Sequence, residues 1–88
     1  MKITTNSGES STTDLGLAST LVTLGFLLER LDRGNPSRVQ FVFRADPEVD
    51  KAVQAYWDGQ LEVDPQAYFN NTKRIKSQLY SGIGNADR

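Results

Sequence analysis

The side chains best suited to binding a ligand in this 88-residue sequence are cationic, and they fall in two stretches. Residues 66–80 hold three cations and no acid, and residues 26–45 hold four arginines against two acids. The predicted binding residues are Arg33, Arg38, Arg44, Lys73, Arg74, Lys76 and Tyr80. Arg and Lys pair with phosphates and Tyr can stack on bases, so nucleic-acid binding is one hypothesis. The other is a solvated strand face, with cations that suit the last turns of a helix.

Acidic side chains concentrate in residues 46–64, which hold six acids and one lysine. Divalent cations such as Ca²⁺ bind several oxygen ligands, so a metal site is a second hypothesis. The spacing does not match an EF-hand loop. Asp46, Glu48, Asp50 and Asp64 instead fall at predicted helix starts, where negative charge is favourable. We therefore expect capping roles for these acids and no metal site.

Catalysis has little support in the residue types. The sequence contains no His and no Cys, which removes the commonest general base and two of the usual zinc ligands. Ser and Thr are plentiful, but no His can activate them, and Lys51 has no evident hydrophobic pocket. Asp58 and Glu62 could form a carboxylate pair, yet so small a domain offers little cleft. We predict a protein that is not an enzyme and uses no cofactor.

Three helices are predicted from capping residues and apolar spacing. Asp46-Pro47 and Asp64-Pro65 each place a capping carboxylate before a proline at the first helical position. Apolar residues then recur at helical spacing up to Trp57, which we expect in the core, and Gly59 ends that helix. An earlier helix begins at residues 12–14 and is apolar over a wide arc, so we expect it to be central.

Residues 26–33 and 36–45 predict two antiparallel strands around Gly34-Asn35. Gly at the first position of a two-residue loop suits a type II′ turn. That turn would set Phe26 opposite Phe43, with the other pairs following in register. The predicted fold is therefore α+β, of order α-β-β-α-α, with an antiparallel β-hairpin packed on one face by three helices.

The predicted domain organisation is a single α+β domain over residues 12–80. Residues 1–11 are small and polar and indicate a flexible N-terminal tail, although Lys2–Thr5 could add an edge strand. Residues 81–88 indicate a frayed C-terminal tail. The most apolar run, residues 15–28, is too short to span a bilayer and lies behind a polar tract, unlike a signal peptide. We therefore expect a cytoplasmic protein that does not bind membranes.

Several of these residues resemble a family of small bacterial and phage proteins of unassigned function, over residues 14–80. The resemblance is strongest in the pattern Tyr56-Trp57-x-Gly59-x-Leu61-x-Val63-Asp64-Pro65. The other matching residues are Leu17, Ala18, Leu21 and Gly25, then Phe41, Val42 and Phe43, then Phe69, Lys73, Lys76, Leu79 and Tyr80. The resemblance implies a bacterial or phage origin and brings no catalytic residues.

Together these patterns indicate a small non-catalytic accessory module that binds a protein partner, and they are compatible with a homodimer. The alternative is weak nucleic-acid binding through the basic hairpin face and the basic third helix. The two interpretations differ in whether the cationic side chains share one face.

Overall fold

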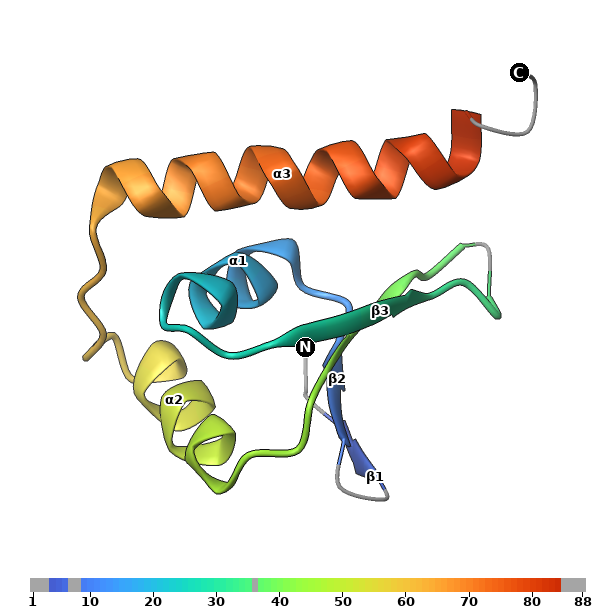
Figure 1. The fold of residues 1–88 in the computed structure, drawn as a ribbon. Coiled ribbons are helices and arrows are strands. Elements are labelled where there is room, and N and C mark those ends of the chain that lie inside the picture. The colour runs from blue at the N-terminus through green and yellow to red at the C-terminus, as the bar shows by residue number, and fades with distance from the viewer. Residues whose placement is uncertain (1–3, 7–8, 36, 85–88) are drawn as a thin grey trace.

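The residues that the structure describes, 4–6, 9–35 and 37–84 of a computed structural model, form four strands and three helices (Figure 1). In chain order they are β1 Thr4–Asn6, β2 Glu9–Thr12, α1 Leu15–Thr23, β3 Leu28–Asp32, β4 Gln40–Phe43, α2 Pro47–Trp57 and α3 Pro65–Gly84. The predicted α+β class is confirmed, and so is the order α-β-β-α-α from α1 onward.

An aspartate caps the start of each helix, as the sequence predicts for α2 and α3. The capping bonds are Leu17 N–H to Asp14 Oδ1 (3.0 Å), Glu48 N–H to Asp46 Oδ1 (2.9 Å) and Ala67 N–H to Asp64 Oδ2 (2.8 Å). Gly25 (φ 103°) and Gly59 (φ 72°) follow α1 and α2. These positive φ angles are readily available only to glycine, so both residues end their helices.

The core surrounds α1, which lies between α3 and the sheet (Figure 1). Its buried apolar side chains are Leu17, Ala18, Leu21, Phe41, Phe43, Val49, Ala52, Val53 and Ile75. All three helices contribute to the cluster that contains Phe41 and Phe43, so they lie on one side of the sheet, as predicted, with α3 outside α1. Where α3 meets α1, Asn71 Nδ2 donates to Thr23 Oγ1 at 3.0 Å.

The sheet has the order β1-β2-β4-β3, with antiparallel neighbours throughout. The predicted N-terminal tail therefore needs correction, because residues 4–6 and 9–12 are strands and β2 is internal to the sheet. Ser10 pairs with Phe43 and Thr12 with Phe41, and both side chains are buried. The free edge of β4 supplies the backbone partners that this polar segment needs. Residues 1–3 lie outside the described residues.

The predicted two-residue turn and its register are wrong. Leu28, not Phe26, pairs with Phe43, and the register shifts between Leu28 and Arg30. The connection is longer because Asp32 Oδ1 accepts the Gly34 N–H at 2.9 Å. Asn35 similarly accepts the Ser37 N–H through its side chain and the Arg38 N–H through its carbonyl oxygen. Such side-chain turns compete with a tight hairpin.

Helix α3 is longer than predicted, since it continues through residues 81–84. The predicted C-terminal tail is therefore helical over those four residues, and residues 85–88 lie outside the described part of the chain. With this turn α3 is 20 residues long, and none of the other described elements covers its outer side (Figure 1).

Candidate functional site

Two aromatic and two cationic side chains form a line along the exposed side of α3. Phe69, Lys73, Lys76 and Tyr80 are spaced by four, three and four residues, which places them on one helical face. Phe69 is 60% exposed and Tyr80 is 58% exposed, and both lysines are also exposed. The Lys73 Nζ atom lies 5.2 Å from the centroid of the Phe69 ring, a cation–π contact. We call these four residues the α3 stripe.

The stripe unites three of the predicted binding residues with one that the sequence analysis did not select. That residue is Phe69, which follows Tyr68 directly in the sequence. Its spacing of four residues from Lys73 was the available signal, because residues four apart lie side by side on a helix.

Arg38 and Tyr80 meet at a groove of about 440 Å³ between the β3–β4 connection and α3. Leu15 and Leu79 supply apolar parts of its lining. Arg33 lies at the same junction, where its Nη2 atom donates to the Gln78 carbonyl oxygen at 3.0 Å. Arg33 therefore ties the hairpin to α3, whereas Arg38 adds a positive charge next to the stripe.

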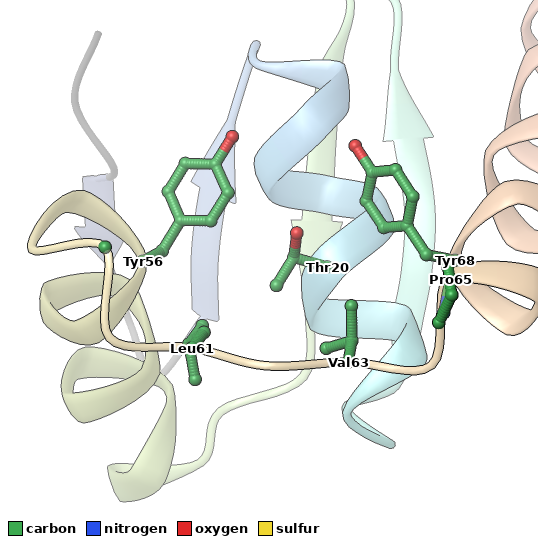
Figure 2. Close-up of a pocket in the computed structure, with 7 residues that line it drawn as sticks. Thr20, Tyr56, Leu61, Val63, Pro65 and Tyr68 are labelled. Atoms are coloured by element: carbon green, nitrogen blue, oxygen red, sulfur yellow. The ribbon is translucent and has the colours of Figure 1, made fainter.

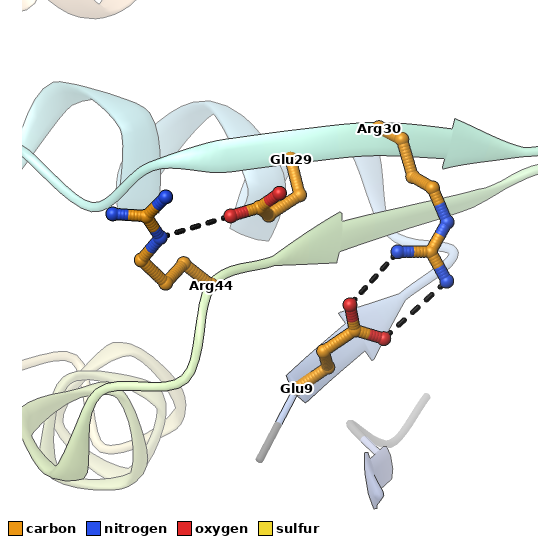
Figure 3. Close-up of polar contacts among 4 residues, drawn as sticks. All are labelled: Glu9, Glu29, Arg30 and Arg44. Atoms are coloured by element: carbon orange, nitrogen blue, oxygen red, sulfur yellow. Dashed lines mark hydrogen bonds and ion pairs between the residues drawn. The ribbon is translucent and has the colours of Figure 1, made fainter. Parts of the chain in front are cut away.

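Arg44 and Arg74 do not join this group. Arg44 lies beyond the opposite end of β4, where its Nε atom donates to Glu29 Oε2 at 2.9 Å (Figure 3). Arg74 lines a different groove, beside Leu27 and Leu28. The structure thus places Lys73, Lys76 and Tyr80 on one face of α3 and brings Arg38 next to Tyr80. It separates the remaining predicted residues by place or by pairing.

The outer face of the sheet carries a second ion pair, which spans two strands that are not neighbours. Arg30 in β3 donates to both Glu9 carboxylate oxygens in β2, at 2.8 and 3.3 Å, across β4 (Figure 3). The hydrogen bond and the charge of Arg30 lower the pKa of Glu9 below its ordinary value. Arg30 and Glu9 therefore pair with each other on this face.

Trp57 is not a core residue, contrary to the prediction. Its side chain is 48% exposed in the last turn of α2, and its ring meets the Tyr56 ring edge-on at 4.8 Å and 82°. The buried residues of α2 are Val49, Ala52 and Val53. Trp57 lies at the margin of the buried face of α2. It follows Val53 by about one helical turn, and the neighbouring Tyr56 side chain points further toward the core.

A pocket of about 390 Å³ opens where α2, α3 and their connector meet α1 (Figure 2). Its walls include Thr20, Tyr56, Leu61, Val63, Pro65 and Tyr68, which define the tyrosine pocket. Tyr56 and Tyr68 project from different helices on either side of Thr20 (Figure 2). Nothing in the spacing of these residues along the sequence indicates a pocket.

Within the described ranges, no three acidic side chains lie close enough together to hold a metal ion. In the same part of the chain, no helix combines the length and apolar character needed to cross a bilayer.

Comparison with known proteins places the chain in a family whose function is unknown. No curated protein and no solved structure matches it. The matching family is described as a domain of unknown function, DUF5659, and the match covers residues 8–81. The matched segment begins just before β2 and ends within α3, so it contains both the α3 stripe and the tyrosine pocket. Because most of the chain is matched, this protein belongs to the DUF5659 family.

Proposed function

We propose that the chain is a small non-catalytic module that binds a protein partner through the α3 stripe. The observation that carries the proposal is the exposure of Phe69 and Tyr80 on one helical face. Phe69 and Tyr80 are among the residues that resemble the family of small bacterial and phage proteins, which favours a bacterial or phage origin. The proposed site of action is the cytoplasm.

The chemistry of the stripe indicates what the partner should present. Large aromatic side chains bury much apolar area when covered, and they dominate the binding energy of many interfaces. Lys73 and Lys76 lie between the two rings and would attract carboxylates. We therefore expect an acidic partner surface with an apolar centre, because that surface would complement both the rings and the ammonium groups.

Affinity capture with paired variants tests this proposal. The tagged wild type, Phe69→Ala/Tyr80→Ala and Asn70→Ala/Ser77→Ala would each be incubated with lysate of the encoding organism and compared by quantitative mass spectrometry. Asn70 and Ser77 are exposed on the same helix and are seven residues apart, as are Phe69 and Lys76 of the stripe. They therefore serve as a matched control. A protein retained by wild type and control but lost from Phe69→Ala/Tyr80→Ala supports the proposal.

The proposal fails if the same proteins are retained by wild type and Phe69→Ala/Tyr80→Ala. It also fails if no protein is retained and the wild type remains a monomer in sedimentation. A wild-type dimer that dissociates in the double variant would instead identify a second copy of the chain as the partner.

Single-stranded nucleic acid is a second candidate, favoured by the alternation of rings and ammonium groups along the stripe. Bases stack on exposed aromatic rings, while cations follow the phosphates. Arg38 lies next to Tyr80 and would add one phosphate contact. Arg44 would contribute little, because Glu29 already neutralises it.

The salt dependence of oligonucleotide binding tests this second candidate. Each phosphate contact on a single strand contributes a log–log slope of about −0.7. Lys73→Ala/Lys76→Ala should flatten the slope by about two contacts, whereas Arg44→Ala should leave it unchanged. No detectable binding at low salt, or equal slopes in all three proteins, rejects nucleic acid as the partner.

A further inference from the structure

The tyrosine pocket has three polar groups at one end, above the backbone of Gly16. The position that a Cβ atom would take on Gly16 lies 2.9 Å from the Tyr56 hydroxyl oxygen and 3.6 Å from that of Tyr68. The same position lies 3.2 Å from Asp14 Oδ1. Groups from α2, α3 and the start of α1 thus converge where Gly16 has no side chain to fill the space.

These converging groups keep hydrogen-bonding capacity. Among the described residues, neither tyrosine hydroxyl makes a hydrogen bond, while Asp14 Oδ1 accepts the Leu17 N–H at 3.0 Å. Thr20 Oγ1 donates its hydrogen to the Gly16 carbonyl oxygen at 2.9 Å, so this hydroxyl can only accept a hydrogen bond from a ligand. A hydroxyl that donates and accepts, beside a carboxylate that only accepts, suits a ligand rich in N–H donors.

The electrostatic environment favours positive charge. None of the described residues that line the pocket is Lys or Arg, and Asp14 lies at its polar end. Burial raises the pKa of Tyr56, and the negative charge of Asp14 and the neighbouring Tyr68 raise it further. The positive end of α1 opposes this field, but it amounts to only about half a charge. Burial disfavours a phenolate and a cation alike, but the negative charge of Asp14, which adds to the shift, stabilises a cation at the same place.

The remaining walls suit an apolar body. Leu61, Val63 and Pro65 come from the connector and the first residue of α3, and the two aromatic rings stand on either side (Figure 2). Tyrosine ring faces attract ammonium groups as well as apolar groups. A volume of about 390 Å³ lies within the range of small-molecule sites.

We propose that the tyrosine pocket binds a small organic ammonium ion. Its charged head would lie near the hydroxyls of Tyr56 and Tyr68 and the Asp14 carboxylate, and its apolar body against Leu61 and Val63. This site is separate from the α3 stripe, since no stripe residue lines it. Binding here can therefore be tested whatever the stripe binds.

Three probes that each carry a phenyl ring separate the effect of charge from the effect of shape on binding: benzylamine, benzyl alcohol and benzoate. Each would be titrated into the ¹⁵N-labelled full chain at neutral pH, and the amide shifts of Gly16, Gly59, Leu61 and Val63 would be followed. We expect benzylamine to bind about tenfold more tightly than benzyl alcohol, the effect of one charge-assisted hydrogen bond. Benzoate should bind most weakly.

Matched variants assign the preference to the polar end. Asp14→Asn keeps a capping side chain but removes the charge, so benzylamine and benzyl alcohol should then bind equally well. Asp46→Asn makes the same change at the cap of α2 and should preserve the tenfold preference. Tyr56→Phe/Tyr68→Phe keeps both rings and should weaken benzylamine binding, which provides a second test if Asp14→Asn does not fold.

The proposal is overturned if benzylamine binds no better than benzyl alcohol to the wild type, or if none of the probes shifts the pocket amides. A preference that persists in Asp14→Asn also overturns it. Where Asp14→Asn is unfolded, benzylamine binding that is as tight in Tyr56→Phe/Tyr68→Phe as in the wild type overturns it.

Discussion

Trp57 and Ile75 show how differently single apolar residues are used in this domain. Ile75 is 1% exposed and lies in the core where α3 meets α1, whereas Trp57 is 48% exposed. The Trp57 ring retains one edge-on contact with Tyr56, which also helps to orient a wall of the tyrosine pocket. Size alone therefore does not identify the residues that stabilise the fold.

Substitution of each residue by alanine should reveal this difference. Trp57→Ala should lower the free energy of unfolding by about 1 kcal/mol, the scale of one aromatic pair contact. Ile75→Ala should lower it by about 2–5 kcal/mol because it leaves a cavity in the core. Urea unfolding followed by circular dichroism measures both. A larger loss for Trp57→Ala would show that the indole ring is buried.

At the scale of elements, the Glu9–Arg30 pair links β2 to β3 over the intervening strand β4. Val42 in β4 faces away from the core cluster, yet it is only 4% exposed, and its register partners are Ser11 and Arg30. The stem of Arg30 can cover Val42 while its guanidinium group reaches Glu9. The ion pair therefore shields an apolar residue on the outer face of the sheet.

This linkage predicts a dependence of stability on pH. The folded-state pKa of Glu9 lies below its ordinary value of about 4.5, so folding stabilises the ionised form. The resulting contribution is present above the ordinary value and is lost as pH falls below it. The difference in stability between wild type and Glu9→Gln should therefore shrink as pH falls below about 4.5.

The Glu9 carboxyl resonance in NMR provides the matching measurement. Arg30→Gln should return the pKa of Glu9 upward to its ordinary range, because the hydrogen bond from Arg30 is the main cause of the shift. An unchanged titration in Arg30→Gln would show that Arg30 does not pair with Glu9 in solution.

Local signals predicted the helices well and the strand pairing poorly. The Asp-Pro starts at Asp46 and Asp64 depend on the capping residue and its immediate neighbours, so they can be identified from sequence. The hairpin register depends on competing side-chain turns at Asp32 and Asn35. Strand β2 depends on the distant strand β4, and its Ser and Thr side chains give no apolar alternation.

The candidate site residues likewise divide into those that could be placed from sequence and those that could not. Lys73, Lys76 and Tyr80 could be assigned to one helical face because spacing within a helix fixes their relation. Arg38 and Arg44 could not, since their positions follow from the hairpin geometry. The tyrosine pocket combines α1, α2, α3 and a connector, so only the tertiary structure brings Asp14 to the two tyrosines.

At the scale of the whole molecule, the N-terminal strands belong to the folded unit. Removal of residues 1–12 would expose an edge of β4 and would remove Thr12 Oγ1, which accepts the Asp14 N–H at 3.1 Å. We expect the melting temperature to fall by at least about 10 °C, since 1 kcal/mol corresponds to about 4–8 °C in so small a domain. Calorimetry of both proteins checks this, and equal melting temperatures would show that residues 9–12 are dispensable.

The whole molecule also combines a net charge of −1 with a local line of cations and rings on α3. Such a molecule would not attract acidic partners through its total charge, so selectivity must come from the stripe itself. The proposed function therefore depends on one helical face and not on the overall composition.

The most direct test of that claim is a calorimetric titration of the captured partner, once purified, against three forms of the chain. The wild type and Asn70→Ala/Ser77→Ala should bind with equal affinity. Phe69→Ala/Tyr80→Ala should bind at least about tenfold more weakly, because it loses both rings of the stripe while its core is unchanged. Equal affinity in all three forms would contradict the assignment of the α3 stripe as the binding face.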